Sequence, residues 1–581
     1  MANGVFSTPM GPVLVLWVGA LVLHVLDRFL TPQDRGVAEA LVLALGLGFL
    51  IGTRSQIDAP LSFGQFLTGA GRSDVPPFLV AGQTSWTLAL LAVVTSFASS
   101  LASLGQSTDG RAGRLAALGS ALLFVFAGDW ATLTVAWVLV DVCLLHTLGD
   151  TRKRTDALGW TGILSLGGAV ALGIGLLLWH QADGSIWVDR GGAVPHLATA
   201  ATHLPSHASS VLILAALLRL MPFPLPTWLT DFGREAQAKD QRFAQVLTYL
   251  VPTLLGGYLW MRLAGWNVIG QAARWLIVLP IWGGWAMIIS ALKAWAARDP
   301  AELVACTGTF GGACVLMAAG LNLPAPWQTL ISANAILSVS VLFVSWTQCQ
   351  HLRMFDPRSF WRIAPAGLGL LSLAGLPLTI GFPARVALYH AVFADQRWFS
   401  LTLVVAAELL LFGALLRVLL ELELVPEEET EEAAPSSSPV ALWELKERVY
   451  DGLAYGAGAI LALGIVVLGL APRLPDQSSS LPSLGNWLGL PTLPVWAALL
   501  LAVVGALVVY RSRNMVLNLT QGWGGLIERL FGFGWLYRSI ETLSRYVGAL
   551  IWGSTQVVEG AGYMAWVALV CLVILLFVIA R

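Results

Sequence analysis

Long apolar stretches separated by short polar connections run along almost the whole of this 581-residue chain. Most of them reach the roughly 20 residues that an α-helix needs to cross the hydrocarbon core of a bilayer. Sixteen stretches can be counted, at residues 11–30, 36–53, 78–104, 113–128, 130–149, 158–180, 206–222, 241–264, 274–296, 301–321, 325–347, 363–394, 397–421, 448–471, 492–511 and 564–580. The pattern predicts an all-α polytopic membrane protein with about 16 transmembrane helices.

The composition supports this class of protein and excludes a soluble enzyme. Hydrophobic residues make up 57% of the chain and charged residues only 12%, whereas soluble domains carry about 25% charged residues. The net charge of -1 and the lack of a basic run give no indication of a nucleic-acid partner. The five cysteines are scattered, so their spacing predicts neither a metal site nor a disulfide framework. We therefore expect no metal and no cofactor.

The Lys and Arg residues test the number and direction of the spans. With the N-terminus outside, the odd-numbered connections hold 22 of the 33 Lys and Arg residues, and the even-numbered connections with the C-terminus hold 8. The remaining 3 lie within spans. Positive charge favours cytoplasmic connections, so this distribution predicts both termini on the outer side.

Two polar segments do not fit the span pattern. Residues 426–439 are acidic and rich in Pro and Ser, which predicts a disordered cytoplasmic loop or a plain solvated linker. Residues 526–551 have the spacing of an amphipathic helix, which could rest on the lipid surface or on a neighbouring subunit. Its apolar face holds Leu536, Ile540, Leu543, Val547, Leu550 and Ile551, and its polar face holds Arg538, Glu541 and Arg545.

Two spans combine a charge with residues that break a helix. Arg219, near the end of the seventh span, is followed by Pro222 and Pro224. Charged residues inside membrane spans are costly and usually functional. A helix break there is tolerated where protein or a water-filled cavity surrounds it. Together these features are typical of an ion pathway.

The twelfth span repeats this combination. It breaks at Gly375 and Pro377 and then continues with Arg385 and His390. Five spans separate it from the seventh, and an odd displacement reverses the direction across the membrane, which is the pattern of an inverted repeat. The alternative is that prolines recur by chance in long apolar sequences, but a charged arginine recurs with them.

Four motifs make the chain resemble the antiporter-like subunits of respiratory complex I, especially the large subunit L, and the related subunits of Mrp-type antiporters and DAB-type carbon transporters. FAGDWATLTVAWVLVDVC (126–143) is similar to the family's F-x-G-D-W-x-x-L-x-x-A-W-E-L-V-G-x-C. LPTWLTDF (225–232) and SLAGLPLTIGFPAR (372–385) match two further family patterns. GFGWLYRSIETL (532–543), ahead of a last span, resembles the subunit L tail and favours that subunit over its shorter paralogues.

This resemblance implies two inverted five-helix repeats and a cytoplasmic lateral helix in the membrane of a multi-subunit complex, taken to be a bacterial inner membrane. It implies proton or cation translocation coupled to a partner's reaction, with no redox centre in this chain. The lateral helix near 526–551 would contact other membrane subunits. The domains expected are N-terminal helices 1–112, repeats 113–264 and 274–421, a loop 422–447, helices 448–511, the lateral helix 520–560 and a last span 564–581.

The proton-relay positions of the family are depleted in this sequence. The fifth-span glutamate aligns with Val138, and the lysines of the seventh and twelfth spans align with Arg219 and Arg385. In the eleventh span, Asn334 and Ser338 stand where the family keeps a histidine and a lysine. Arginine does not give up its proton in proteins, so Arg219 and Arg385 can hold a charge but cannot relay protons.

Other polar residues are candidates for the pathway. Asp141 lies three residues after Val138 on nearly the same helix face and either replaces the missing glutamate as a partner of Arg219 or faces water at the end of its span. Glu408 is mid-span and needs a partner or a proton. Lys293 and His390 are either pathway members or, respectively, a snorkelling lysine and a satisfied core histidine. Arg417 is expected to snorkel.

Three hypotheses follow from these observations. The chain is an ion-translocating subunit of a complex I-like assembly, as the fold and family indicate. Alternatively, it is an architectural subunit that conducts nothing, as the lost lysines favour. The third hypothesis is a DAB-type partner of a carbon-hydrating subunit, against which the tail argues.

Overall fold

The computed structural model describes residues 8–57, 60–62, 77–104, 110–128, 130–149, 155–183, 205–220, 242–265, 268, 273–297, 300–349, 357–421, 442–470 and 493–515, with single positions between 539 and 549. The described chain contains sixteen α-helices and the short 3-10 helix η1 (Thr53–Gln56). The α-helices are α1 (Met10–Leu26), α2 (Pro32–Gly52), α4 (Gln83–Ala102), α5 (Arg111–Phe126), α6 (Trp130–Gly149), α7 (Thr155–Asp183), α9 (Ser206–Leu220), α11 (Arg242–Gly265), α13 (Ala273–Ala296), α14 (Pro300–Gly320), α15 (Ala325–Cys349), α16 (Pro357–Leu373), α17 (Gly381–Ala394), α18 (Trp398–Glu421), α19 (Leu442–Leu470) and α21 (Leu493–Arg511).

Fourteen of the predicted spans each coincide with one described helix, and the twelfth is divided between α16 and α17. The predicted span 564–580 and the acidic loop 426–439 lie outside the described residues. Within the described part, seven helical segments are long and apolar enough to cross a membrane, and six shorter helices are also apolar. The chain is therefore a helical, polytopic integral membrane protein.

A small β-sheet departs from the all-α prediction. Strands β1 (Pro60–Ser62) and β2 (Pro77–Val80) pair antiparallel, and Leu79 forms a further bridge to Ala127, just after α5. Strands of three and four residues contain too few alternating positions to stand out in a sequence. The sheet lies in the connection between α2 and α4.

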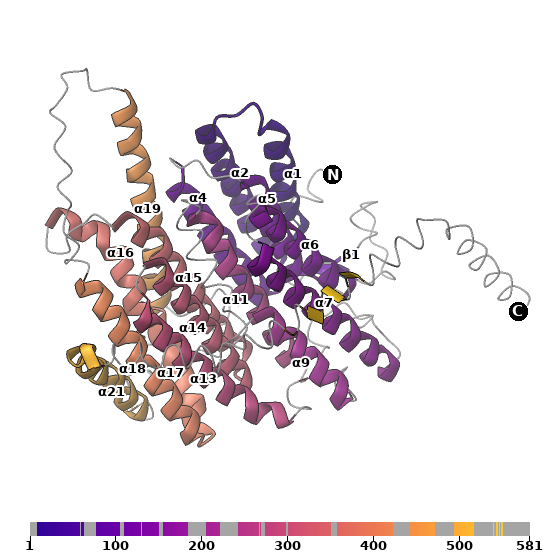
Figure 1. Ribbon diagram of the computed structural model, residues 1–581. Coiled ribbons are helices and arrows are strands. Elements are labelled where there is room, and N and C mark those ends of the chain that lie inside the picture. The colour runs from indigo at the N-terminus through magenta and orange to yellow at the C-terminus, as the bar shows by residue number, and fades with distance from the viewer. Residues whose placement is uncertain are drawn as a thin grey trace, which may run out of the picture. The chain divides into compact units, whose positions relative to one another are not determined.

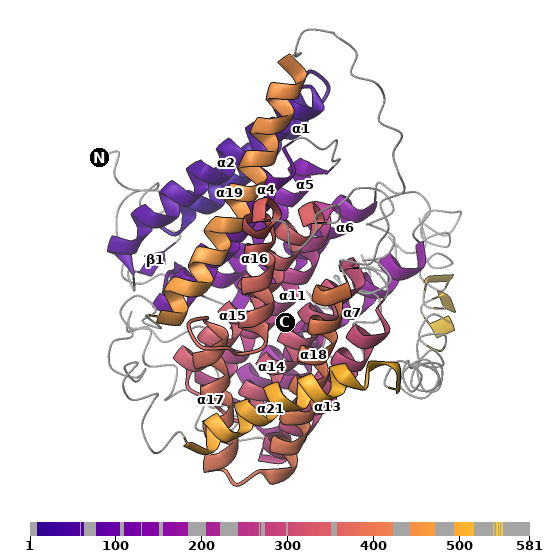
Figure 2. The ribbon, with the colours of Figure 1, turned by 90° about the vertical axis from the view of Figure 1, so that its left-hand side faces the viewer.

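The helices of the first compact unit, Met1–Gly524, pack side by side with α4 near the centre. Helix α4 contacts α2, α5, α11, α15 and α19. The early helices α1, α2, α5, α6 and α7 lie on one side, and α16, α17, α18 and α19 lie on the other (Figure 1). Helix α21 crosses the outside of this second group against α18 (Figure 2).

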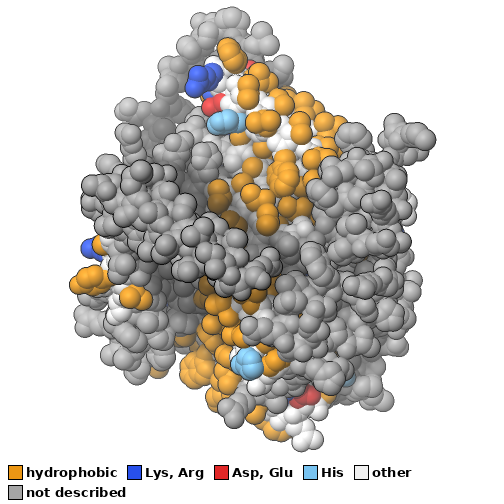
Figure 3. Space-filling model, turned by 90° about the vertical axis from the view of Figure 1, so that its right-hand side faces the viewer, with side chains coloured by type: hydrophobic (Ala, Val, Ile, Leu, Met, Phe, Trp, Pro, Cys, Tyr) orange, Lys and Arg blue, Asp and Glu red, His pale blue; other side chains and the backbone are white. Residues whose placement is uncertain are grey.

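Large apolar side chains are exposed on the outside of many helices, as expected of a surface that faces lipid. Along α1, the exposed ones are Val18, Leu21, Val22, Val25 and Leu26. Figure 3 shows one such face, on which apolar side chains dominate the coloured surface and the few charged ones lie near its margins. Among the described residues, 32 polar or charged ones are buried inside the bundle. The candidate sites are built around the charged residues of this set.

Local sequence sets the start of α2. Thr31 at the N-cap accepts a hydrogen bond from the backbone N–H of Asp34 (3.3 Å), and Pro32 occupies the first turn. Both residue types are favoured there because the first N–H groups of a helix lack partners inside it. Arg35 pairs with Asp27 at 2.9 Å and so closes the connection from α1.

A buried charge cluster joins α2 to α5. Glu39 binds Arg111 at 2.7 Å and Arg114 at 3.2 Å, and Arg111 also donates to the carbonyl of Ser103 at 3.1 Å. All three charged side chains are almost completely buried. Breaking such a buried pair leaves an uncompensated charge, so the cluster fixes how these two helices meet.

The break between α16 and α17 occurs where the sequence places Gly375 and Pro377. Gly375 has φ +73° and Leu378 has φ +71°, and the left-handed region is easiest for glycine. The N–H of Ile380 donates to the carbonyl of Ile465 in α19 (3.0 Å), outside its own helix. At Gly381 the backbone passes so close to the carbonyl of Ser372 that a Cβ would collide with it. The predicted broken helix is therefore present here.

The second compact unit spans Gly525–Arg581 and contains the predicted lateral helix. Its described residues are helical and exposed: Ser539, Thr542, Leu543, Arg545, Tyr546, Gly548 and Ala549. The rest of the predicted amphipathic helix lies outside the described residues, so its length and its contacts stay predictions.

Candidate ion pathway

The first polar centre surrounds Arg219 in the last turn of α9. This side chain is buried, and its Nη1 lies 2.6 Å from Asp141 Oδ1 on α6. The same nitrogen donates to Ser165 Oγ on α7 at 2.8 Å, and Ser165 in turn donates to Asp141 Oδ2. Three helices thus contribute an arginine, a carboxylate and a hydroxyl to one hydrogen-bonded group.

Aromatic rings enclose this centre on the apolar side. The Arg219 guanidinium lies 4.8 Å from the ring centre of Trp137 and 5.9 Å from that of Phe124. The indole N–H of Trp137 also donates to Ser165 Oγ at 3.1 Å. A cation over a desolvated aromatic face is stabilised electrostatically, so the charge of Arg219 is balanced by both Asp141 and the rings.

The second polar centre surrounds Arg385 at the start of α17. Its Nη1 lies 2.8 Å from Glu408 Oε1 on α18 and donates to Cys314 Sγ on α14 at 3.2 Å. Its Nη2 donates to the carbonyl of Leu373, the last residue of α16, at 3.0 Å. The hydroxyl of Tyr389 donates to the other oxygen of Glu408. Arg385 therefore links the broken ends of α16 and α17 to α14 and α18.

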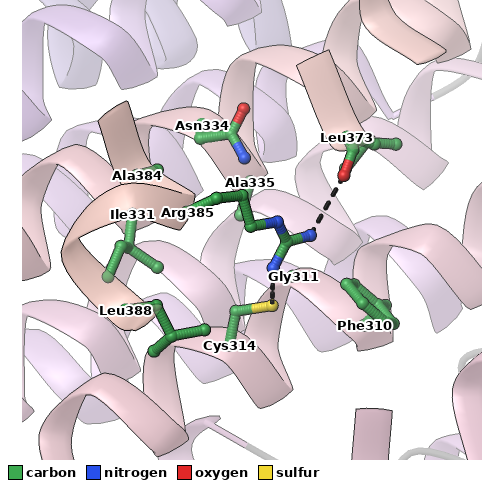
Figure 4. Close-up of a pocket in the computed structure, with 10 residues that line it drawn as sticks. All are labelled: Phe310, Gly311, Cys314, Ile331, Asn334, Ala335, Leu373, Ala384, Arg385 and Leu388. Carbon is green, nitrogen blue, oxygen red and sulfur yellow. Dashed lines mark hydrogen bonds between the residues drawn. The ribbon is translucent and has the colours of Figure 1, made fainter. Parts of the chain in front are cut away.

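A small cavity of about 10 Å³ lies beside Arg385, close to the smallest space that holds one water molecule. Figure 4 shows the guanidinium reaching toward Cys314 and Leu373, with Phe310 and Asn334 nearby. The guanidinium carbon lies 5.2 Å from the ring centre of Phe310. Arg385 therefore has an aromatic neighbour, as Arg219 does in the first centre.

Asn334 and Ser338, the replacements for the family's histidine and lysine, stabilise the helix break. The side-chain oxygen of Asn334 accepts hydrogen bonds from Ser338 (3.1 Å) and Ser372 (2.8 Å). Ser372 Oγ also accepts from the N–H of Gly381 at 3.2 Å. These residues hold α15, α16 and α17 together and provide no ionisable group.

The remaining candidates lie apart from the two centres. Val138 is 41% exposed, so the position aligned with the family's glutamate faces away from Arg219. His390 is exposed, and Lys293 is half-buried in the last turn of α13. Pro222 and Pro224 lie outside the described residues. The structure thus brings Asp141 to Arg219 and Glu408 to Arg385.

Sequence reasoning missed several partners in these centres. Ser165, Trp137, Cys314 and Tyr389 are ordinary residues of apolar helices, and their hydrogen-bond partners in these centres are 19 to 71 positions away along the chain. One signal was present for Tyr389, because it follows Arg385 by four residues and so lies on the same helix face.

The expectation for Arg417 is wrong, because this arginine does not snorkel. Its side chain is buried and donates to the carbonyls of Trp295 (2.6 Å) and Ala297 (2.8 Å) at the end of α13. A C-terminal carbonyl carries partial negative charge, so it can hold the guanidinium inside the bundle.

Between the two centres, the described helices meet through small residues. At Gly256, α11 passes the backbone of Leu220, the residue after Arg219, so closely that a Cβ would have no room. Gly257 faces Ser332 on α15, and Gly311 faces Ala335. Glycines here bring the backbones together, as small residues do in membrane bundles. None of these residues can carry a proton.

The comparisons with known proteins point to one family. No protein-family model matches the chain. NADH-quinone oxidoreductase subunit N of Cereibacter sphaeroides (strain ATCC 17025 / ATH 2.4.3) is 28% identical over 354 residues, which cover 58% of this chain and 76% of that protein. Subunit N is one of the shorter paralogues, so the choice of subunit L over the others stays a prediction.

Three solved structures share the fold. A chain of the Mrp complex from Dietzia sp. DQ12-45-1b matches with a TM-score of 0.71 and 18% identity over 99% of this chain, which spans only 63% of that longer chain. A chain of the membrane-bound sulfane sulfur reductase, an archaeal respiratory membrane complex, matches with a TM-score of 0.68 and 16% identity over 98% of this chain and 99% of its own.

Respiratory complex I from Thermus thermophilus with bound aureothin contains a third match, with a TM-score of 0.54 and 19% identity over 80% of this chain and 99% of its own. At these identities the structures support the fold, and the subunit N relative supports the sequence family. The chain is thus similar in sequence to subunit N of NADH-quinone oxidoreductase and shares its fold with antiporter-like membrane chains of Mrp, sulfane sulfur reductase and complex I assemblies.

Proposed function

We propose that the chain takes part in proton or cation translocation as a membrane subunit of a complex I-like assembly, with a reduced relay. The observation that carries this proposal is a buried arginine paired with a carboxylate in each half of the bundle, Arg219 with Asp141 and Arg385 with Glu408. Buried charges inside a membrane are costly and are usually kept for function. The names of the matched complexes support the same role.

The carboxylates, and not the arginines, are the groups that exchange protons in this proposal. Arg219 and Arg385 keep their protons and act as fixed positive charges. Asp141 and Glu408 can gain and lose a proton, and each has a hydroxyl neighbour that can accompany the change, Ser165 and Tyr389 respectively. Lys293 and His390 are further members of the pathway in this proposal, toward its ends.

Two inverted five-helix repeats provide the frame of the pathway. Helices α5, α6, α7, α9 and α11 form the first repeat, and α13, α14, α15, α16 with α17, and α18 form the second. Their packing supports the assignment, because α5 packs on α6 and α7 on α9 just as α13 packs on α14 and α15 on α16. The domain boundaries predicted at 113–264 and 274–421 follow these groups.

The further parts of the proposal concern the surroundings. Both termini lie on the periplasmic side of a bacterial inner membrane, as the Lys and Arg distribution indicates. Other membrane subunits contact the lateral helix near 526–551, and redox chemistry belongs to those partners.

A second candidate function is an architectural subunit that does not conduct. It is favoured by the contacts of α11 with α9 and α15, where Gly256 packs on Leu220 and Gly257 on Ser332, and none of these described residues is ionisable. In this alternative, the two ion pairs hold helices together and no proton passes between them.

Proton flux in vesicles separates the two candidates. The chain is reconstituted with its partner subunits, and flux is compared for the parent, Asp141→Asn, Glu408→Gln and the double variant. The relay proposal expects flux in the parent and a loss of at least about tenfold in each single variant, in the range of one general acid–base group. Asp395→Asn is the matched control, because this exposed acid pairs only with Arg397 in the described part.

Each result decides between the candidates. Flux in the parent that survives the double variant contradicts the carboxylate relay. A parent that folds and assembles but shows no flux supports the architectural subunit.

A further inference from the structure

A second arginine in each half binds the end of another helix. Arg262 on α11 donates from Nη1 to the carbonyl of Ala127, just after α5, at 2.6 Å. Arg417 on α18 donates to the carbonyl of Ala297, just after α13, at 2.8 Å, and to that of Trp295 at 2.6 Å. Neither arginine belongs to the two central ion pairs.

The two contacts occupy corresponding places in the proposed repeats. Helices α11 and α18 are the last of their repeats and have 24 residues each. Arg262 lies three residues before the end of α11, and Arg417 lies four before the end of α18. Ala127 and Ala297 are each the first residue after the first helix of the same repeat.

The sequence around the bound carbonyls corresponds as well. Ala127 is followed by Gly-Asp and then Trp130, where α6 begins, and Ala297 is followed by Arg-Asp and then Pro300, where α14 begins. Aspartate directly before a helix is a favoured N-cap residue. Both alanines therefore stand in a short connection of the same pattern, closing a hairpin of two helices.

An aromatic ring accompanies each arginine. The Arg262 guanidinium lies 5.4 Å from the ring centre of Tyr258, and that of Arg417 lies 5.6 Å from Trp295. Tyr258 packs edge-on against Phe124, with ring centres 6.2 Å apart, and Phe124 faces Arg219. In the other half, the indole N–H of Trp295 donates to the carbonyl of Leu410, two residues after Glu408.

The last carbonyls of a helix have no partner within it and carry partial negative charge. Away from water, they need a donor from elsewhere, and a guanidinium supplies both the donors and the charge. The hairpins that are closed in this way place the helices of the central sites: α6 carries Trp137 and Asp141, and α14 carries Phe310 and Cys314.

We infer that Arg262 and Arg417 are repeat-related positioning residues, each of which fixes the hairpin that forms the wall of the central ion pair in its own half. Arg262 acts on Asp141 through α5 and α6. Arg417 acts on Arg385 and Glu408 through α13, α14 and its own helix. This inference rests on the proposed repeats and on the two carboxylates of the proposed function.

Infrared spectroscopy of the folded chain in lipid nanodiscs tests the inference without requiring flux. The carboxyl bands of Asp141 and Glu408 are assigned by their loss in Asp141→Asn and Glu408→Gln. We expect Arg262→Met to shift the Asp141 band and leave the Glu408 band in place. Arg417→Met is expected to shift the Glu408 band and leave the Asp141 band in place. Lysine at either position retains a charged donor and is expected to return the band most of the way to its position in the parent.

The controls make each outcome decisive. Arg397→Met removes a surface arginine whose partner is Asp395 and is expected to move neither band. Unchanged bands in the folded Met variants overturn the inference, as do shifts of both bands in either one. If a Met variant does not fold, lysine and glutamine are compared at the same arginine position. Equal spectra for these two variants overturn the role of the arginine's charge. If each Met variant shifts only the carboxyl band of its own half but the parent shows no proton flux, translocation is rejected and the positioning role is kept.

Discussion

The two halves of the bundle build a central ion pair from the same kinds of group in different surroundings. In the first half, the side chain of Asp141 is 16% exposed and shares a serine with Arg219. In the second half, Glu408 is 5% exposed and is enclosed by Arg385 and Tyr389. A carboxylate with access to water can change its charge at lower cost than one without.

This difference indicates separate tasks for the two halves. In the proposed relay, the first pair is the place where a proton enters or leaves, because the Asp141 side chain keeps 16% of its surface exposed. The second pair is sealed by the broken ends of α16 and α17, so a change in the charge of Glu408 requires movement of Arg385 or Tyr389. In the proposed relay, the second half is therefore the part of the chain in which we expect ion movement and conformational change to be most closely connected.

Removing Arg385 has the largest expected effect. Arg385→Met leaves Glu408 buried without its cation and is expected to lower the free energy of unfolding by about 3–5 kcal/mol, as for other broken buried pairs. Thermal unfolding in detergent measures the loss. The double variant with Glu408→Gln is expected to recover much of it, and a double variant as unstable as the single one would show that the helix cap on Leu373 dominates.

Removing Arg219 tests the other side of the comparison. Arg219→Met is expected to cost about 2 kcal/mol, less than a fully buried pair, because Asp141 is partly exposed and Ser165 still donates to it. The same unfolding measurement checks it. If Arg219→Met loses as much free energy of unfolding as Arg385→Met, the difference in burial between the two carboxylates does not set the cost of removing the arginine.

The hydroxyl of Tyr389 has an intermediate effect. Tyr389→Phe keeps the ring and removes the hydrogen bond to Glu408, which is expected to cost about 1.5 kcal/mol, within the range of bonds to charged groups. If Glu408 carries protons, the variant also shifts the Glu408 carboxyl band in the infrared spectrum. Tyr450→Phe, on the membrane-spanning helix α19 and distant in sequence from both centres, is the matched control. An unchanged Glu408 band would contradict the role of the hydroxyl.

The sequence predicted the helices and the break better than the partners. Apolar runs locate the spans, and Gly375 with Pro377 locates the break, because both signals are local in the chain. The i to i+3 spacing of Val138 and Asp141 predicted nearly one face of α6, but Val138 is 41% exposed whereas Asp141 pairs with the buried Arg219. The partners Ser165, Cys314 and Tyr389 depend on which faces of distant helices meet, and helices apolar on all sides do not reveal it.

For Arg417, a general sequence rule gave a wrong prediction because its binding partners are distant in the chain. An arginine near the end of a span satisfies a general rule for snorkelling, yet here the free carbonyls of α13 bind it inside the bundle. That contact joins residues 120 and 122 positions apart in the chain, and only the packing of α13 on α18 brings them together.

Removing the Ser165 hydroxyl has the smallest expected effect. Ser165 Oγ takes part in hydrogen bonds with Trp137, Asp141 and Arg219, but Asp141 retains its direct pair with Arg219 and some access to water. Ser165→Ala is therefore expected to cost only about 1 kcal/mol in thermal unfolding. Ser338→Ala in the second half is the matched control, because this serine bonds Asn334 and no charged group. If proton exchange at Asp141 uses the serine, flux falls in Ser165→Ala and not in Ser338→Ala. Equal fluxes would place the exchange of Asp141 directly with water, which would sharpen the contrast with the sealed pair of the second half.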